Sequence, residues 1–121
     1  MTQILIVDDS PTERHVLQTI LENNNYQVST ASTAEEGLEV AQSLMPDLIL
    51  MDVVMPGING FQATRKLSKN AETKDIPVII VTTKDQDTDR VWGMRQGAKD
   101  YLTKPVDEAE LIAKIKTYTG T

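Results

Sequence analysis

Three uninterrupted runs of apolar residues, at residues 4–7, 48–51 and 78–81, constrain the fold more than any other feature of the sequence. A strand with one face in water alternates apolar and polar residues, whereas an unbroken apolar run indicates a strand buried on both faces. Such strands lie in parallel sheets, because the crossover between two parallel strands carries a helix that covers the sheet. The runs therefore predict an α/β fold with a central parallel sheet.

Helix signals between these runs complete an alternation of strands and helices. Residues 10–13 combine a capping serine, a proline at the first helical position and Glu13 three residues after Ser10, which predicts a helix that starts with a capping box. Residues 32–35 repeat that signal. Further strands are expected at residues 26–31 and 101–103, and further helices at residues 61–70, 87–96 and 107–118. Five strand and helix pairs with short connections predict a doubly wound parallel sheet.

The helix expected at residues 87–96 has the weakest pattern of the five. Val91 and Met94 are spaced for an inner face, and Gly97 ends the helix. Trp92 fits two interpretations, a partner surface shared with Tyr101 or partial burial in the core. His15, the only histidine, is expected at the surface.

The composition limits the classes of partner and chemistry. The 121 residues correspond to one domain, and 18 acidic against 12 basic residues give a net charge of −6. A net acidic chain disfavours direct binding to nucleic acid or to anionic membranes. The absence of cysteine excludes disulfides and thiol chemistry and fits a cytoplasmic location. Because the N-terminus shows no basic leader and no long apolar stretch, we expect neither a signal peptide nor membrane insertion.

Polar residues end the predicted strands, at the edge where open α/β sheets bind ligands. Asp8 and Asp9 follow the first strand, Asp52 follows the third, Thr82 closes the fourth and Lys104 follows the fifth. Three carboxylates in one partly buried pocket repel one another unless a proton or a cation intervenes. Carboxylate ligands with retained water suit magnesium, so Mg²⁺ is the expected cofactor.

Asp52 is the strongest candidate for a nucleophile. The chain has no cysteine and no Ser-His pair, and an aspartyl phosphate is a known type of covalent intermediate. Asp52 stands alone after a central strand, whereas the adjacent Asp8 and Asp9 are suited to share a metal. Thr82 and Lys104 then fit as donors to an oxyanion whose other oxygens touch the metal. A single Asp after a strand is more often a turn former or a helix cap. The prediction therefore rests on the five strand-end residues taken together.

These motifs resemble the receiver domain of bacterial two-component response regulators. The resemblance is carried by residues 4–10 (ILIVDDS), residues 50–57 (LMDVVMPG), Thr82 and the Lys104-Pro105 pair. The intervals of 30 residues from Asp52 to Thr82 and 22 residues from Thr82 to Lys104 also suit that family. The resemblance implies a flavodoxin-like sheet with strand order 2-1-3-4-5 and a cis Lys104-Pro105 bond. It also implies that residues 1–121 form one receiver domain with no output domain.

The resemblance further implies a phosphorylation chemistry. Asp52 would accept a phosphoryl group from the phosphohistidine of a CheA-like histidine kinase. Asp8, Asp9 and Asp52 would bind Mg²⁺ together with the backbone carbonyl of Val54. The protein would promote only its own phosphorylation and dephosphorylation, so it is not expected to be an enzyme that acts on a separate substrate.

A conformational output is implied in the same way. Thr82 would turn toward the phosphoryl group, Lys104 would pair with it, and Tyr101 would change rotamer. The signal would then pass to a downstream protein through the face formed by the fourth helix, the fifth strand and the fifth helix.

Residues 60–65 (GFQATR), 83–87 (TKDQD) and 91–98 (VWGMRQGA) are similar to a narrower group, the single-domain twitching-motility regulators of type IV pilus chemosensory systems. This similarity implies a role in pilus-based motility or related chemosensory control. Two positions depart from the flagellar chemotaxis relatives, since Val54 is apolar and Lys84 is basic where that relative has an acid. Both would flank the route of an attacking water, so we expect them to set the lifetime of the phosphoryl group.

Two other function classes are weighed against this prediction. A magnesium-dependent aspartyl-phosphate phosphatase would also use acids at strand ends, but it normally needs two acids that lie two residues apart on the first strand, and Asp8 and Asp9 are adjacent. A flavin or nucleotide module of the same architecture would need neutral or glycine-rich loops, whereas these loops are acidic. The phosphatase remains the alternative.

Overall fold

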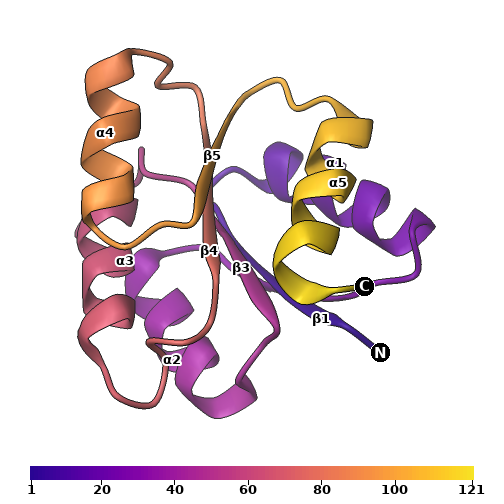
Figure 1. Ribbon diagram of the computed structural model, residues 1–121, viewed down its shortest axis with the longest axis horizontal. Helices are drawn as coiled ribbons and strands as arrows, with labels where there is room; N and C mark the ends of the chain where they lie inside the picture. The colour runs from indigo at the N-terminus through magenta and orange to yellow at the C-terminus, as the bar shows by residue number, and fades with distance from the viewer.

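Five strands and five helices alternate along residues 1–121, all of which the computed structural model describes (Figure 1). The strands are β1 (Gln3–Val7), β2 (Gln27–Ala31), β3 (Leu48–Met51), β4 (Val78–Thr82) and β5 (Asp100–Thr103). The helices are α1 (Pro11–Asn23), α2 (Ala34–Leu44), α3 (Gly60–Lys69), α4 (Asp87–Arg95) and α5 (Glu108–Thr119). The predicted alternation is confirmed, and the expected boundaries either coincide with the observed ones or differ by one residue.

All strand pairs are parallel, and the sheet has the order β2-β1-β3-β4-β5, which confirms the predicted order. Helices α1 and α5 cover one face of the sheet, and α2, α3 and α4 cover the other (Figure 1). The pairing sets Val7 of β1 opposite Met51 of β3. Because each of these residues ends its strand, the residues that follow them emerge side by side at the carboxyl edge of the sheet.

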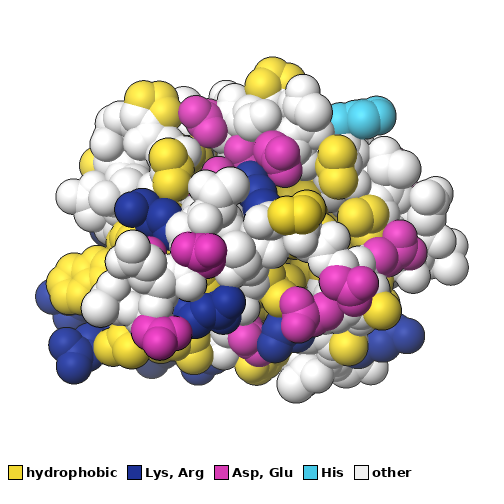
Figure 2. Space-filling model, turned by 90° about the horizontal axis from the view of Figure 1, so that it is seen from above, with side chains coloured by type: hydrophobic (Ala, Val, Ile, Leu, Met, Phe, Trp, Pro, Cys, Tyr) yellow, Lys and Arg dark blue, Asp and Glu magenta, His cyan; other side chains and the backbone are white.

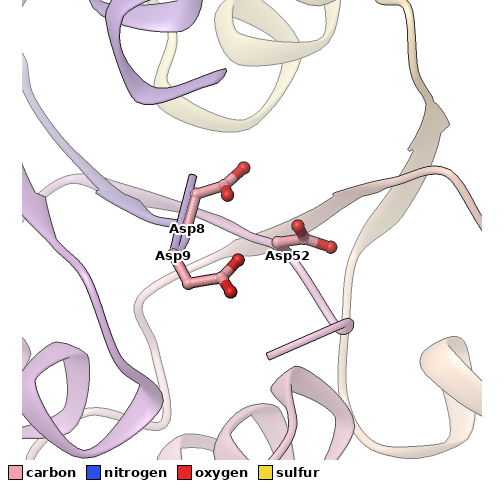
Figure 3. A group of neighbouring side chains, drawn as sticks. All are labelled: Asp8, Asp9 and Asp52. Carbon is pink, nitrogen blue, oxygen red and sulfur yellow. The ribbon is translucent and has the colours of Figure 1, made fainter. Parts of the chain in front are cut away.

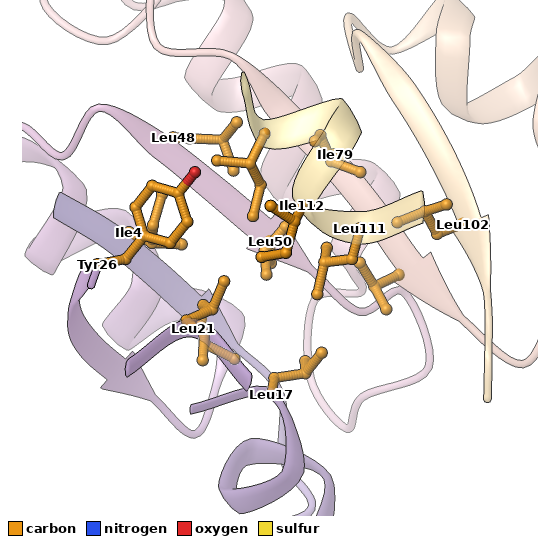
Figure 4. Close-up of a cluster of buried hydrophobic side chains, with 13 residues drawn as sticks. Ile4, Leu17, Leu21, Tyr26, Leu48, Leu50, Ile79, Leu102, Leu111 and Ile112 are labelled. Carbon is orange, nitrogen blue, oxygen red and sulfur yellow. The ribbon is translucent and has the colours of Figure 1, made fainter. Parts of the chain in front are cut away.

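The apolar runs are buried on both faces of the sheet, as predicted. Ile4 and Ile6 of β1 pack into a cluster that includes residues of α1 and α5 (Figure 4). The alternate residues Leu5 and Val7 pack into a second cluster with residues of α2 and α3. Side chains of successive strand residues point to opposite faces, so a strand between two helical layers needs an apolar residue at every position.

The two predicted capping boxes are only partly correct. Ser10 caps α1 by accepting a hydrogen bond from the Glu13 N–H (3.3 Å), but the Glu13 carboxylate lies near Lys104 instead of returning to Ser10. At α2 the cap is one residue later than predicted. Thr33 accepts from the Glu36 N–H (3.0 Å), and the Glu36 carboxylate accepts from the Ser32 N–H (2.7 Å).

The prediction that Val91 and Met94 of α4 face the core is wrong. Their exposed fractions are 53% and 46%, and Trp92 is 51% exposed, while Gly93 is buried. A Cβ at position 93 would lie 2.7 Å from Cδ1 of Ile80. The side of α4 that meets the sheet therefore accepts only a small residue, and the larger apolar side chains turn outward.

Two smaller observations concern the surface and the length of the helices. His15 is exposed, as predicted. Among the helices, none combines the length and the apolar character that a membrane crossing requires.

Asp100 connects the start of β5 to α5. Its carboxylate accepts hydrogen bonds from the Tyr101 N–H (2.8 Å), from the Tyr118 hydroxyl (3.0 Å) and from Lys114 Nζ (3.0 Å). Burial alone would raise the pKa of Asp100, but these three donors outweigh it and hold the pKa below its ordinary value of 3.8. The ionised form of Asp100 therefore stabilises the folded state.

We predict that Asp100→Asn lowers the free energy of unfolding by about 1 kcal/mol at neutral pH, because an amide accepts weaker hydrogen bonds than a carboxylate. A carboxyl group with a lowered pKa in the folded state stabilises the protein above its unfolded pKa, and loses that contribution as the pH falls through the folded pKa. The difference between wild type and variant should thus shrink in acid. Urea unfolding at a series of pH values measures it, and a difference that stays constant down to acid pH would contradict the prediction.

Candidate metal and phosphoryl site

Three carboxylates meet at the carboxyl edge of the sheet, as the sequence predicts. Asp8 and Asp9 follow β1 and Asp52 follows β3, and Figure 3 shows their side chains extending from the two strand ends into the same region. One carboxylate oxygen from each lies within 4.8 Å of the other two. Asp8 and Asp52 are buried, whereas Asp9 is exposed. The cluster is therefore closed on its inner side and open to water beside Asp9.

Lys104 reaches this cluster from the end of β5. Its Nζ lies 2.6 Å from Oδ2 of Asp8 and 3.3 Å from Oδ2 of Asp52, and its side chain is only 8% exposed. The Lys104 N–H donates to the Thr82 carbonyl (2.8 Å), and the Lys104-Pro105 bond is cis, as expected. Figure 2 looks onto this edge and shows Asp and Glu side chains around a basic one in its upper half.

Each buried carboxylate is held at both oxygens. Oδ1 of Asp8 accepts from the Ser10 N–H (2.9 Å), and Oδ1 of Asp52 accepts from the Val54 N–H (3.1 Å). The other oxygen of each faces Lys104. These backbone donors were not predicted from the sequence, although an Asp that accepts from the N–H two residues later is a common local turn.

The pKa values reflect competition between burial and pairing. Burial raises the pKa of Asp8 above its ordinary value, and Lys104 and the Ser10 N–H offset only part of that effect. Burial would lower the pKa of Lys104, but its bonds to Asp8 and Asp52 raise it above its ordinary value. The Lys104 ammonium thus pairs with Asp8 and Asp52, and Asp9 adds a third carboxyl group to the same cluster, so the pocket holds more acid than Lys104 alone compensates.

The donor set fits a hard divalent cation. Magnesium binds carboxylate oxygens and keeps several waters, and it usually takes only a few protein ligands. Three carboxylate oxygens that lie close together, with one acid open to solvent, match that preference. Asp8, Asp9 and Asp52 are therefore the residues that would hold such an ion.

Thr82 and Tyr101 lie near this cluster but do not contact its carboxylates. Thr82 is fully buried at the end of β4, and its Oγ1 accepts from the Lys84 N–H at 3.5 Å. The buried Tyr101 hydroxyl donates to the Lys84 carbonyl (2.9 Å), and the Arg90 guanidinium lies 5.1 Å from the centre of the Tyr101 ring. Burial and the negative charge of Asp89 raise the pKa of Tyr101 to about 12. The backbone of Lys84 thus connects the two residues predicted to form the switch.

Gly60 allows α3 to start directly against the backbone of Asp52. A Cβ at position 60 would lie 2.0 Å from the Asp52 carbonyl oxygen. The helix is capped one residue earlier by Asn59, which accepts from the Gln62 N–H while the Gln62 side chain accepts from the Asn59 N–H (both 2.9 Å). Asp52 is therefore held by β3 on one side and by the first turn of α3 on the other.

Known proteins resemble this chain in sequence and in fold. The model of the response regulator receiver domain family matches residues 4–116. Protein PilH of Pseudomonas aeruginosa is 62% identical over 115 residues, which is 95% of this chain and 95% of PilH. The solved structure of chemotaxis protein CheY4 from Vibrio cholerae has a TM-score of 0.91 and 30% identity, and the match covers 98% of each chain.

One further solved structure bears on the acidic cluster. The receiver domain of a sensor histidine kinase from Pseudomonas aeruginosa has a TM-score of 0.91 and 29% identity, and the match covers 99% of this chain and 98% of that one. In that neighbour a magnesium ion is coordinated in the active-site cleft.

We predict that Gly60→Ala destabilises the protein by about 1–3 kcal/mol or more, although alanine ordinarily favours a helix over glycine. The added methyl group must displace the backbone of Asp52, so the stabilisation gained from added magnesium chloride should shrink as well. Chemical unfolding with and without magnesium measures both quantities.

Gly120→Ala is the matched control for Gly60→Ala. No atom lies within 4 Å of a Cβ at position 120, so only the strain of its positive φ of 76° should appear, and the effect of magnesium should stay the same. If Gly60→Ala were as stable as wild type, the close approach of the α3 backbone to the Asp52 backbone would not exclude a side chain at position 60, which would contradict the prediction.

Proposed function

Because the chain belongs to the response regulator receiver family, we propose that it is a stand-alone phosphorylation switch that accepts a phosphoryl group on Asp52 from a histidine kinase. One observation carries this proposal. Lys104 lies between Asp8 and Asp52 in a pocket with three carboxyl groups, so Asp52 sits where both an incoming anion and a divalent cation find partners.

In the proposed reaction an Asp52 carboxylate oxygen attacks the phosphorus of a phosphohistidine. The new O–P bond forms as the P–N bond breaks, and the electron pair of that bond stays on the histidine ring. Lys104 is placed to neutralise charge on the transferred group, because its Nζ is already 3.3 Å from Asp52 Oδ2. A magnesium ion, when bound by Asp8, Asp9, Asp52 and the Val54 carbonyl, would supply further positive charge against the phosphoryl oxygens.

The proposed switch runs through Thr82, Lys84 and Tyr101. A phosphoryl group on Asp52 offers acceptors to the Thr82 hydroxyl and to Lys104, and the Lys84 backbone connects Thr82 to the Tyr101 hydroxyl. A movement of Thr82 would then favour another position of Tyr101, by shifting an equilibrium between two arrangements. The surface formed by α4, β5 and α5 would change and pass the signal to a protein partner.

We also propose that the pathway is a chemosensory one with a CheA-like kinase, and that its output concerns pilus-based twitching motility. The motifs at residues 60–65, 83–87 and 91–98 support this assignment, as does the 62% identity to protein PilH. That match covers 95% of this chain and 95% of PilH.

We predict that Asp52→Asn abolishes phosphoryl transfer, because an amide oxygen is a poor nucleophile. The measurement is transfer of labelled phosphate from a purified, autophosphorylated histidine kinase in the presence of magnesium. Wild type should take up at most one phosphoryl group per chain, and chelation of magnesium should prevent the uptake. Asp75→Asn, which changes an exposed acid outside the pocket, should accept labelled phosphate from the kinase as wild type does.

Two outcomes would count against the switch. Labelling that persists in Asp52→Asn would place the phosphoryl group on another residue. Many cycles of hydrolysis of a small phosphomonoester by each protein molecule would favour the alternative, a magnesium-dependent aspartyl-phosphate phosphatase.

We predict that Val54→Asn shortens the lifetime of the phosphoryl group several-fold. Val54 is 50% exposed beside Asp52, and an amide there can orient a water for attack on phosphorus, which the valine cannot do. The rate of loss of label from the phosphorylated protein measures the effect. Val91→Asn is the control, because Val91 is 53% exposed but lies on α4. Equal rates for Val54→Asn and wild type would contradict the prediction.

A further inference from the structure

A groove between α3 and α4 lies outside the acidic pocket and has no role in the proposed phosphoryl chemistry. It has a volume of about 400 Å³ and is lined by Asn59, Phe61, Gln62, Arg65, Trp92 and Gln96. A second hollow of about 490 Å³ shares Gln62 and Arg65 with it and continues along α3 past Lys66, Lys69 and Asn70. Together they form an elongated surface depression, here called the α3–α4 groove.

The α3–α4 groove is basic although the whole chain is acidic. Helix α3 carries Arg65, Lys66 and Lys69 and has no acidic residue, whereas the net charge of the protein is −6. All four ion pairs of the protein involve Lys104 or Lys114, so these three cations have no acidic partner. Lys66 and Lys69 suit the last turn of a helix, where the helix dipole favours cations, but Arg65 lies nearer the middle of α3.

The groove also has an apolar centre. Trp92 is 51% exposed at its edge, and Phe61, which is 9% exposed, lines it. Figure 2 shows Lys and Arg side chains gathered around an exposed hydrophobic side chain at its lower left, on the side of α3 and α4. An exposed tryptophan with arginine beside it is the composition typical of the centre of a protein interface.

We propose that the α3–α4 groove binds an acidic peptide segment of a partner protein that carries a large apolar side chain. The acidic residues would pair with Arg65, Lys66 and Lys69, and the apolar side chain would pack between Trp92 and Phe61. Nucleic acid and anionic membranes fit less well, because three cations on a chain of net charge −6 give a local patch and not a basic surface.

This surface is distinct from the face formed by α4, β5 and α5. On α4, Arg90 faces β5, where it stacks on Tyr101 and donates to Thr103 (2.9 Å), whereas Trp92 faces α3. The proposal does not depend on phosphorylation of Asp52, so it can fail while the proposed function stands. Two protein partners could therefore occupy the two sides of α4.

A display library of random short peptides, screened on the full-length protein, tests the proposal. Enriched peptides should combine several Asp or Glu residues with one large apolar residue. Because Trp92 is the only tryptophan, synthetic copies of the enriched peptides should shift its fluorescence emission, and their affinity should fall with added salt.

Charge reversal supplies the specific test. Arg65→Glu with Lys69→Glu should weaken binding of those peptides by about tenfold or more, because like charges then face each other. Lys99→Glu with Lys116→Glu makes the same change in net charge at exposed positions outside the groove and should bind as wild type does. Circular dichroism and the unfolding midpoint show that each variant is folded, and Arg65→Gln with Lys69→Gln should give a smaller loss if the first pair is unfolded.

Three results would overturn the proposal. The first is a set of enriched peptides with no excess of acidic residues, and the second is acidic peptides that bind the charge-reversal variant as tightly as wild type. The third is a shift of the Trp92 emission by a DNA duplex or by a vesicle containing phosphatidylglycerol, with no shift by the acidic peptides, which would assign the groove to another class of ligand.

Discussion

The site depends on one interaction, the placement of the Lys104 ammonium between Asp8 and Asp52. It joins the ends of β1, β3 and β5, and it does so where all three side chains are nearly excluded from water. A buried charge without a partner would cost several kcal/mol, so each of these groups is held by the others. The pairing is incomplete, because Asp9 adds a third carboxyl group. That remaining negative charge makes the pocket suitable for a cation.

Much of this arrangement could be predicted from the sequence, because strand burial and strand ends leave strong local signals. The apolar runs predicted β1, β3 and β4. The polar residues at the ends of these runs, Asp8, Asp9, Asp52 and Thr82, were predicted to form the site. The carboxyl ends of parallel strands share one edge of the sheet, so Asp8 and Asp52, which are 44 positions apart in the chain, were expected to lie close together. The backbone donors to Asp8 and Asp52 depend on how each loop leaves its strand, so the residue type Asp makes such a turn common but does not by itself locate it.

Helix α4 shows why the rest could not be predicted. A periodic pattern locates the core side of a helix only where the core accepts large side chains. Ile80 and Tyr101 fill the space under α4, so Gly93 faces them and Val91 and Met94 turn outward. Similarly, Glu36 and not Glu35 completes the cap of α2, because the chain enters that helix one residue later than the motif suggests. The correction at α4 comes from neighbours that are distant in sequence, whereas the one at α2 is a local shift of the cap by one residue.

The small cluster under α4 lies between the two surfaces proposed to bind partners. Val53, Phe61, Ile80, Ala98 and Tyr101 pack together. Val53 follows Asp52, Phe61 lines the α3–α4 groove, and the Tyr101 hydroxyl bonds to Lys84, whose N–H also reaches Thr82. Tyr101 and Phe61 thus belong to one packed cluster, which offers a physical route between Asp52 and the α3–α4 groove. If Asp52 is phosphorylated as proposed and Tyr101 changes position with it, a peptide that binds better to one position of Tyr101 would bind the phosphorylated and unphosphorylated forms with different affinities.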